Sequence, residues 1–84
     1  MPYSILILPR AGRALRTLPE NDAERIDAAI EGLAENPRPV GSKKLKGEEA
    51  YRIRVGDYRV VYSIDDNERI VLIADVGHRR EIYR

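Results

Sequence analysis

The chain has 84 residues, with 15 lysines and arginines against 14 aspartates and glutamates, and it lacks cysteine. This length suits one small domain, residues 1–84, with a single core. The composition excludes a disulfide framework, a thiolate metal site and a histidine-rich zinc site, so we expect no metal or other cofactor. No apolar run approaches the ~20 residues of a membrane span, and no signal-like segment is visible, which favours a cytoplasmic protein without membrane contact.

The first half of the chain predicts one strand and two helices. Residues 3–8 are rich in isoleucine and leucine and form a strand that ends at Pro9. Residues 10–18 form a short helix, and a second helix follows Pro19 and runs to Glu35, with Asn21 or Asp22 as its cap. Both helices carry apolar residues at helical spacing: Ala11, Ala14, Leu15 and Leu18 in the first, and Ile26, Ala29, Ile30 and Leu33 in the second. We expect an antiparallel helix pair.

The second half predicts a loop and three strands. Residues 37–50 contain the proline, glycine and serine of an irregular segment. Residues 51–62 read as two strands, a turn covers 65–68, and a last strand runs over 70–76 and ends at Gly77. The order indicates an α+β domain: an N-terminal strand, a helix hairpin on one sheet face, a three-strand antiparallel meander and a short C-terminal tail.

The segment 51–62 is the most informative part of the chain. A two-residue turn at Gly56 and Asp57 predicts a tight hairpin in which Arg54 lies opposite Arg59. One face is then apolar or aromatic and belongs to the core, and it holds Tyr51, Ile53, Val55, Tyr58, Val60 and Tyr62. The other face carries Arg52, Arg54 and Arg59, although like charges opposite each other cost up to ~1 kcal/mol. Either an anion binds there, or acidic side chains neutralise the arginines, or they splay into water.

Charge is divided along the chain. Residues 20–35 hold six acidic residues and one basic one, whereas residues 38–59 hold seven basic residues against three acidic ones. A basic surface is therefore possible on a protein whose net charge is only +1. Lys43, Lys44 and Lys46 are either a solvated loop or one wall of a basic cleft shared with the hairpin.

Cationic chemistry is what these residues support. Arginine offers planar, permanently charged donors that suit phosphate. Tyr83 lies among arginines and either stacks on an unpaired base or anchors the C-terminus on the sheet. His78, the single histidine, is either a proton carrier or a structural residue. Without a metal, RNA can be cleaved through its own 2′-hydroxyl if cations stabilise the phosphorane.

The order of elements, together with LKG, YRIRVGDYRVVY and VGHRREIY, resembles the RelE side of the RelE/ParE toxin superfamily over essentially the whole chain. The resemblance implies a toxin of a type II toxin–antitoxin system that cleaves mRNA in the ribosomal A site. In that family the 2′-hydroxyl attacks the adjacent phosphate and leaves a 2′,3′-cyclic phosphate and a 5′-hydroxyl. By position, Arg59 would stabilise the transition-state phosphate, Arg79 would assist the leaving oxygen and Tyr83 would stack on the message.

Two positions depart from the family pattern. Arg52 and Arg54 stand where well-studied members carry lysines, and arginine effectively cannot act as a base. Arg54 would therefore stabilise charge, while His78, solvent or a group elsewhere moves the proton. Further contacts with RNA phosphates are expected from the basic loop, the hairpin and the tail: Lys43, Lys44, Lys46, Arg52 and Arg80.

The resemblance also implies a partner, a RelB-like antitoxin that wraps the toxin, with operator DNA contacted only through that antitoxin. An acidic, partly disordered chain would suit the exposed sheet edges and the basic cleft. Two alternatives stay open: a ParE-like inhibitor of DNA gyrase, and a catalytically idle domain that binds only antitoxin and operator DNA.

Overall fold

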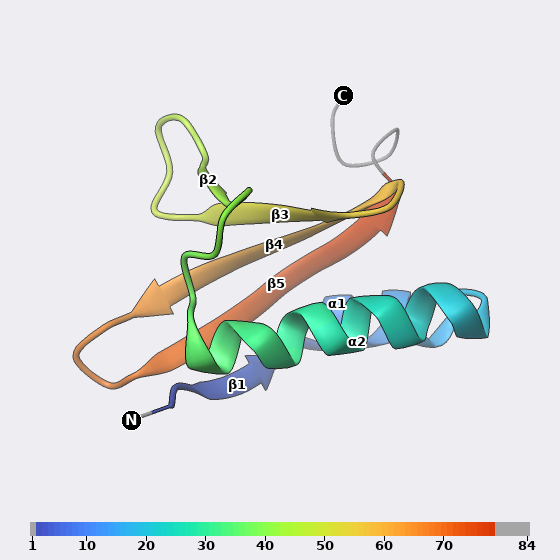
Figure 1. Cartoon of the computed structure of the whole chain (residues 1–84), viewed down its shortest axis with the longest axis horizontal. Coiled ribbons are helices and arrows are strands. Elements are labelled where there is room, and N and C mark those ends of the chain that lie inside the picture. The colour runs from blue at the N-terminus through green and yellow to red at the C-terminus, as the bar shows by residue number, and fades with distance from the viewer. Residues whose placement is uncertain (1, 79–84) are drawn as a thin grey trace.

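The computed structural model describes residues 2–78 as two helices and one five-stranded sheet (Figure 1). The elements are β1 (Ser4–Ile7), α1 (Pro9–Arg16), α2 (Glu20–Glu35), β2 (Lys43–Lys44), β3 (Tyr51–Val55), β4 (Tyr58–Asp65) and β5 (Ile70–His78). The strand order is β1-β5-β4-β3-β2, with β1 parallel to β5 and every other pair antiparallel. The α+β class and the meander of β3, β4 and β5 are confirmed.

One core joins the helices to the sheet. Ala11 of α1 and the α2 residues Ile26, Ile30 and Leu33 are buried together with strand residues such as Val60. The remaining predicted helix positions, Ala14, Leu15, Leu18 and Ala29, pack against the same cluster. The helical spacing in the sequence therefore identified the buried faces correctly, because residues three and four apart share one side of a helix.

The hairpin forms in the predicted register, with Arg54 opposite Arg59 and Ile53 opposite Val60. Its turn uses Gly56 at φ 62°, a left-handed conformation that favours glycine. A Cβ at this position would also lie 2.7 Å from Nη2 of Arg25 on α2. The tip of the hairpin is thus closed against the helix layer, and any larger residue at 56 is strained.

Three expected boundaries were wrong. The segment 37–50 is not wholly irregular, since Lys43 and Lys44 form the edge strand β2 on β3. Strand β5 does not end at Gly77, because pairing with β4 continues to His78. Helix α1 stops at Arg16, where the Thr17 hydroxyl donates to the Ala14 carbonyl.

Neither proposed side-chain cap of α2 is used. Pro19 occupies the N-cap position without a side-chain hydrogen bond, and Asp22 instead pairs with Arg25 at 3.0 Å. The acids in the first turn, Glu20 and Asp22, still complement the helix dipole. In the described chain, neither helix is long and apolar enough to cross a membrane.

Candidate functional site

A cleft of about 370 Å³ opens on the sheet face that points away from the helices. We call it the arginine cleft, and its lining is Leu45, Lys46, Glu48, Arg52, Arg59, Val61 and Asp75. Strands β3, β4 and β5 build its floor, because Arg52 lies opposite Val61 and Val61 lies opposite Asp75. The loop between β2 and β3 supplies the rest.

An irregularity in β5 brings Asp75 into the arginine cleft. Val61 pairs with Asp75 but Tyr62 pairs with Ile73, so Ala74 is an extra residue in β5. Such a bulge shifts the alternation of side chains by one position. Ile73 and Val76 therefore both reach the core, while Asp75 between them lines the cleft.

The two arginines that line the cleft are buried, and the third hairpin arginine is not. Arg52 is 7% exposed and Arg59 is 3% exposed, whereas Arg54 is exposed and does not line the cleft. The opposed pair Arg54 and Arg59 is thus separated, one side chain in solvent and the other inside. This arrangement reduces the repulsion that the register predicts.

Two carboxylates, missed by the sequence reasoning, face these cations. Asp75 accepts a hydrogen bond from its neighbour's amide, Val76 N, at 2.9 Å, and its Oδ2 lies 3.5 Å from Nη2 of Arg10. Glu48 lies in the loop that closes the cleft. The acidic pair at positions 48 and 49 was visible in the sequence, but the bulge that turns Asp75 inward was not.

The lysine run divides between two environments. Lys43 and Lys44 are exposed on β2, and Lys44 Nζ lies 3.1 Å from Oε2 of Glu49. Lys46 lines the arginine cleft. The structure thus places one lysine of the predicted run beside Arg52 and Arg59, and two on the adjoining edge strand.

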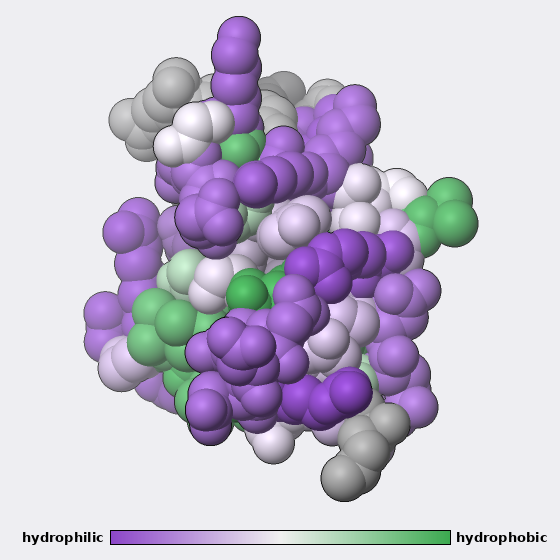
Figure 2. Space-filling view, turned by 90° about the vertical axis from the view of Figure 1, so that its left-hand side faces the viewer, coloured by the Kyte–Doolittle hydropathy of each residue, from purple (hydrophilic) through white to green (hydrophobic). Residues whose placement is uncertain are grey.

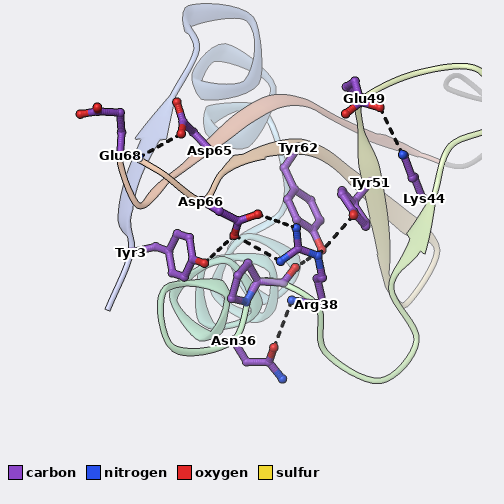
Figure 3. Close-up of polar contacts among 11 residues, drawn as sticks. Tyr3, Asn36, Arg38, Lys44, Glu49, Tyr51, Tyr62, Asp65, Asp66 and Glu68 are labelled. Atoms are coloured by element: carbon purple, nitrogen blue, oxygen red, sulfur yellow. Dashed lines mark hydrogen bonds and ion pairs between the residues drawn. The ribbon is translucent and has the colours of Figure 1, made fainter. Parts of the chain in front are cut away.

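The loop that carries these lysines is anchored by Arg38 (Figure 3). Arg38 donates from Nη2 to Oδ2 of Asp66 at 3.0 Å and from Nε to the Tyr51 hydroxyl at 3.2 Å. Tyr3 donates its hydroxyl to Oδ1 of the same carboxylate at 2.7 Å. The hydrogen bond from Arg38 lowers the pKa of Asp66, and donation to Asp66 raises the pKa of Tyr3.

A second anchor is buried beneath the first. The Tyr62 hydroxyl donates to the Pro37 carbonyl at 2.7 Å, and the Tyr62 ring stacks on Tyr51 with centroids 5.9 Å apart. Burial raises the pKa of Tyr62, so its hydroxyl stays a donor. The hydrogen bonds from Tyr62 to Pro37 and from Arg38 to Asp66 join residues 25 and 28 positions apart in sequence, which explains why sequence patterns did not reveal them.

The predicted proton carrier lies on the other side of the sheet from the cleft floor. His78 pairs with Tyr58, and their rings meet edge to face with centroids 5.6 Å apart. Alternation places Tyr58 on the core face with Val60, while Arg59 points into the cleft. The predicted residues Arg79, Arg80 and Tyr83 lie outside the described residues. Among residues 2–78, no group of three or more metal-ligating side chains gathers.

The side of the molecule that lies on the left in Figure 1 is mainly hydrophilic, with separate hydrophobic areas (Figure 2). The large apolar side chains exposed within the described chain include Leu6 at 50% and Ile7 at 45%. Both belong to β1, which is an edge strand with one neighbour, β5. An edge with exposed apolar side chains is a surface that proteins ordinarily cover.

Comparison with known proteins defines the class. The family model described as ParE toxin of type II toxin–antitoxin system, parDE, matches residues 5–83, and the chain belongs to this toxin family. Within it the similarity lies on the RelE side. Toxin RelG of Mycobacterium tuberculosis is 39% identical across 100% of this chain and 99% of its own length. Toxin RelE of the same organism is 40% identical across 99% of this chain and 88% of its own.

The fold comparison agrees. The toxin–antitoxin complex RelBE2 of M. tuberculosis contains a chain with a TM-score of 0.84 and 32% identity, covering 94% of this chain and 93% of that one. A chain of the archaeal RelE–RelB complex from Pyrococcus horikoshii matches with the same TM-score, 30% identity and coverage of 94% and 97%. The RelE-like fold that the sequence predicted is confirmed.

Proposed function

We propose that this toxin is a ribosome-dependent, metal-independent endoribonuclease that cleaves mRNA in the A site. The observation that carries the proposal is that Arg52 and Arg59 are both buried and line the same open cleft. Two guanidinium groups that line one cleft attract an anion, and partial burial strengthens that attraction because the surroundings are less polar than water. Arginine is also the side chain best shaped to bind phosphate oxygens in pairs.

In the proposed reaction the message supplies the nucleophile. The bond between the 2′-oxygen and phosphorus forms, the bond between phosphorus and the 5′-oxygen breaks, and the products are a 2′,3′-cyclic phosphate and a 5′-hydroxyl. Arg59 and Arg52 stabilise the charge that develops on the phosphorane oxygens. Arg54, exposed at the hairpin tip, and Lys43 and Lys44 on β2 contact flanking phosphates.

Three further roles fall on the C-terminal tail. The family resemblance implies that Arg79 assists the leaving oxygen and that Tyr83 stacks on a base of the message, and Arg80 contacts phosphate as part of the basic tail. All three positions lie outside the described residues.

A RelB-like antitoxin is the proposed partner, since relatives of this chain were solved as RelE–RelB complexes. The exposed β1 edge, with Leu6 and Ile7, and the arginine cleft are its proposed contacts. Operator DNA would be contacted through the antitoxin. The proposed site of action is the cytoplasm, where ribosomes translate.

The test is inducible expression of wild type, Arg59→Ala and the control Arg13→Ala, with transcript ends mapped by primer extension. Arg13 is an exposed arginine on α1. We expect in-frame cuts in translated messages, reduced ~100-fold or more by Arg59→Ala because a transition-state donor is lost, and unchanged by Arg13→Ala. Growth arrest with intact messages and broken DNA would instead indicate gyrase. Neither arrest nor cleavage would indicate a binding domain.

A further inference from the structure

Cleavage through the 2′-hydroxyl requires a group in the arginine cleft that accepts the proton of that hydroxyl. Arg52 and Arg59 stabilise charge, but a guanidinium with a pKa above ~12 does not accept a proton at neutral pH. His78 contacts Tyr58 on the helix-covered face and does not line the cleft. Once the arginines are excluded, three ionisable side chains remain among the described residues that line the cleft: Lys46, Glu48 and Asp75.

Two of these three are poor candidates for a base. Asp75 uses both oxygens, one with the Val76 amide and one with Arg10. A lysine ammonium group has three donors and no acceptor, so it has no lone pair with which to take the proton. An ionised glutamate, in contrast, has two oxygens that only accept.

Glu48 is placed to be that carboxylate. It lines the cleft with Arg52 and Arg59, and within residues 2–78 no hydrogen bond or ion pair engages its side chain. Its backbone is held by the narrow loop between β2 and β3, where Glu48 N donates to the Leu45 carbonyl at 3.3 Å and Leu45 N donates to the Ala50 carbonyl at 2.7 Å. The neighbouring Glu49 carboxylate is 94% exposed and pairs with Lys44.

We propose that Glu48 is the general base of the arginine cleft. Its carboxylate takes the proton of the 2′-hydroxyl as the new bond from oxygen to phosphorus forms. The bond to the 5′-oxygen breaks, and that oxygen takes a proton from water. Glu48 then returns its proton to solvent. This assignment rests on the proposed ribonuclease function and supplies the step that arginines cannot perform.

The structure offers a matched pair of variants, Glu48→Gln and Glu49→Gln. Both remove one negative charge from the same loop without changing side-chain size. For wild type and both variants, the single-turnover rate of cleavage of an mRNA bound to ribosomes would be measured at a series of toxin concentrations. The Tm of each protein would show whether it folds. The conservative variant Glu48→Asp keeps a carboxylate but shortens its reach.

We expect Glu48→Gln to lower the maximal cleavage rate ~100-fold or more, with Glu49→Gln within about twofold of wild type and Glu48→Asp intermediate. The half-saturating toxin concentration should not increase, because Glu48→Gln removes a negative charge from a phosphate site. The charged groups that face Glu48 are Lys46, Arg52, Arg59 and Asp75.

Three results would overturn the assignment. Unchanged cleavage by Glu48→Gln would place the base elsewhere while leaving the ribonuclease function intact. A higher half-saturating concentration at an unchanged maximal rate would make Glu48 a binding residue. If wild-type toxin itself leaves messages intact, the proposed function fails, and the role of Glu48 fails with it.

Discussion

Arg59 and Val60 are neighbours on β4, and both are buried, at 3% and 0% exposure. Alternation turns Val60 toward the helices and Arg59 into the arginine cleft. Burial of an apolar side chain stabilises the fold, whereas burial of a guanidinium opposes it unless partners compensate. Val60 and Arg59 are therefore buried for different reasons: Val60 stabilises the fold, and Arg59 serves the proposed chemistry of the cleft.

The neighbouring strands of the sheet also have one apolar face, toward the helices, and one ionic face, toward the cleft. On the helix side, Ile53, Tyr62 and Ile73 continue the core from strand to strand. On the cleft side the same strands present Arg52 and Asp75. A small domain has little surplus stability, so a guanidinium buried on this face needs partners or a ligand that compensates for its lost hydration.

The largest effects are expected from single substitutions at Val60 and at Arg59. Val60→Ala should lower the free energy of unfolding by about 2–3 kcal/mol, because it leaves a cavity in a fully buried site, and the remaining folded protein should still cleave. Arg59→Met should change that free energy by less than about 1 kcal/mol while abolishing cleavage. Denaturant titration and primer extension measure the two effects. A loss of stability in Arg59→Met as large as that in Val60→Ala would make Arg59 a structural residue.

Local patterns were sufficient for the core face. The two-residue turn at Gly56 and Asp57 sets the hairpin register, and alternation then assigns Ile53 and Val60 to the core, both of which the structure confirms. The helical faces followed from spacing in the same way. These features depend on residues close in sequence, so a single chain reveals them.

The cleft face depends on contacts that sequence spacing does not encode. The extra residue Ala74 turns Asp75 inward, and nothing in the alternation of β5 indicates where a bulge falls. Arg38 meets Asp66 across 28 residues, and β2 pairs with β3 in the segment that follows Arg38. The cationic half of the cleft was therefore predicted from the hairpin, and its carboxylate half was not.

A smaller effect is expected where the core supports the cleft loop. Tyr62→Phe removes the hydroxyl that donates to the Pro37 carbonyl at 2.7 Å, leaving a buried acceptor unsatisfied. We expect a loss of about 1–2 kcal/mol in the free energy of unfolding. Tyr51→Phe is the control, since its hydroxyl bond to Arg38 is exposed, and it should cost less than about 0.5 kcal/mol. Equal losses in the two variants would mean that the buried bond does not anchor the loop.

The smallest effect is expected at the surface link between Arg38 and Asp66. Because the hydrogen bond from Arg38 lowers the pKa of Asp66, the carboxylate form stabilises the folded state above the ordinary aspartate pKa of ~3.9. That contribution is lost as the pH falls through the lower pKa of the folded state. Asp66→Asn should therefore reduce Tm slightly at pH 6 and have no effect once wild-type Asp66 is protonated. Glu68→Gln, an exposed change in the same turn, should leave Tm unchanged at every pH. A Tm difference between wild type and Asp66→Asn that persisted undiminished into strong acid would show that the amide disturbs the turn itself, and that the ion pair with Arg38 does not hold the loop over the cleft.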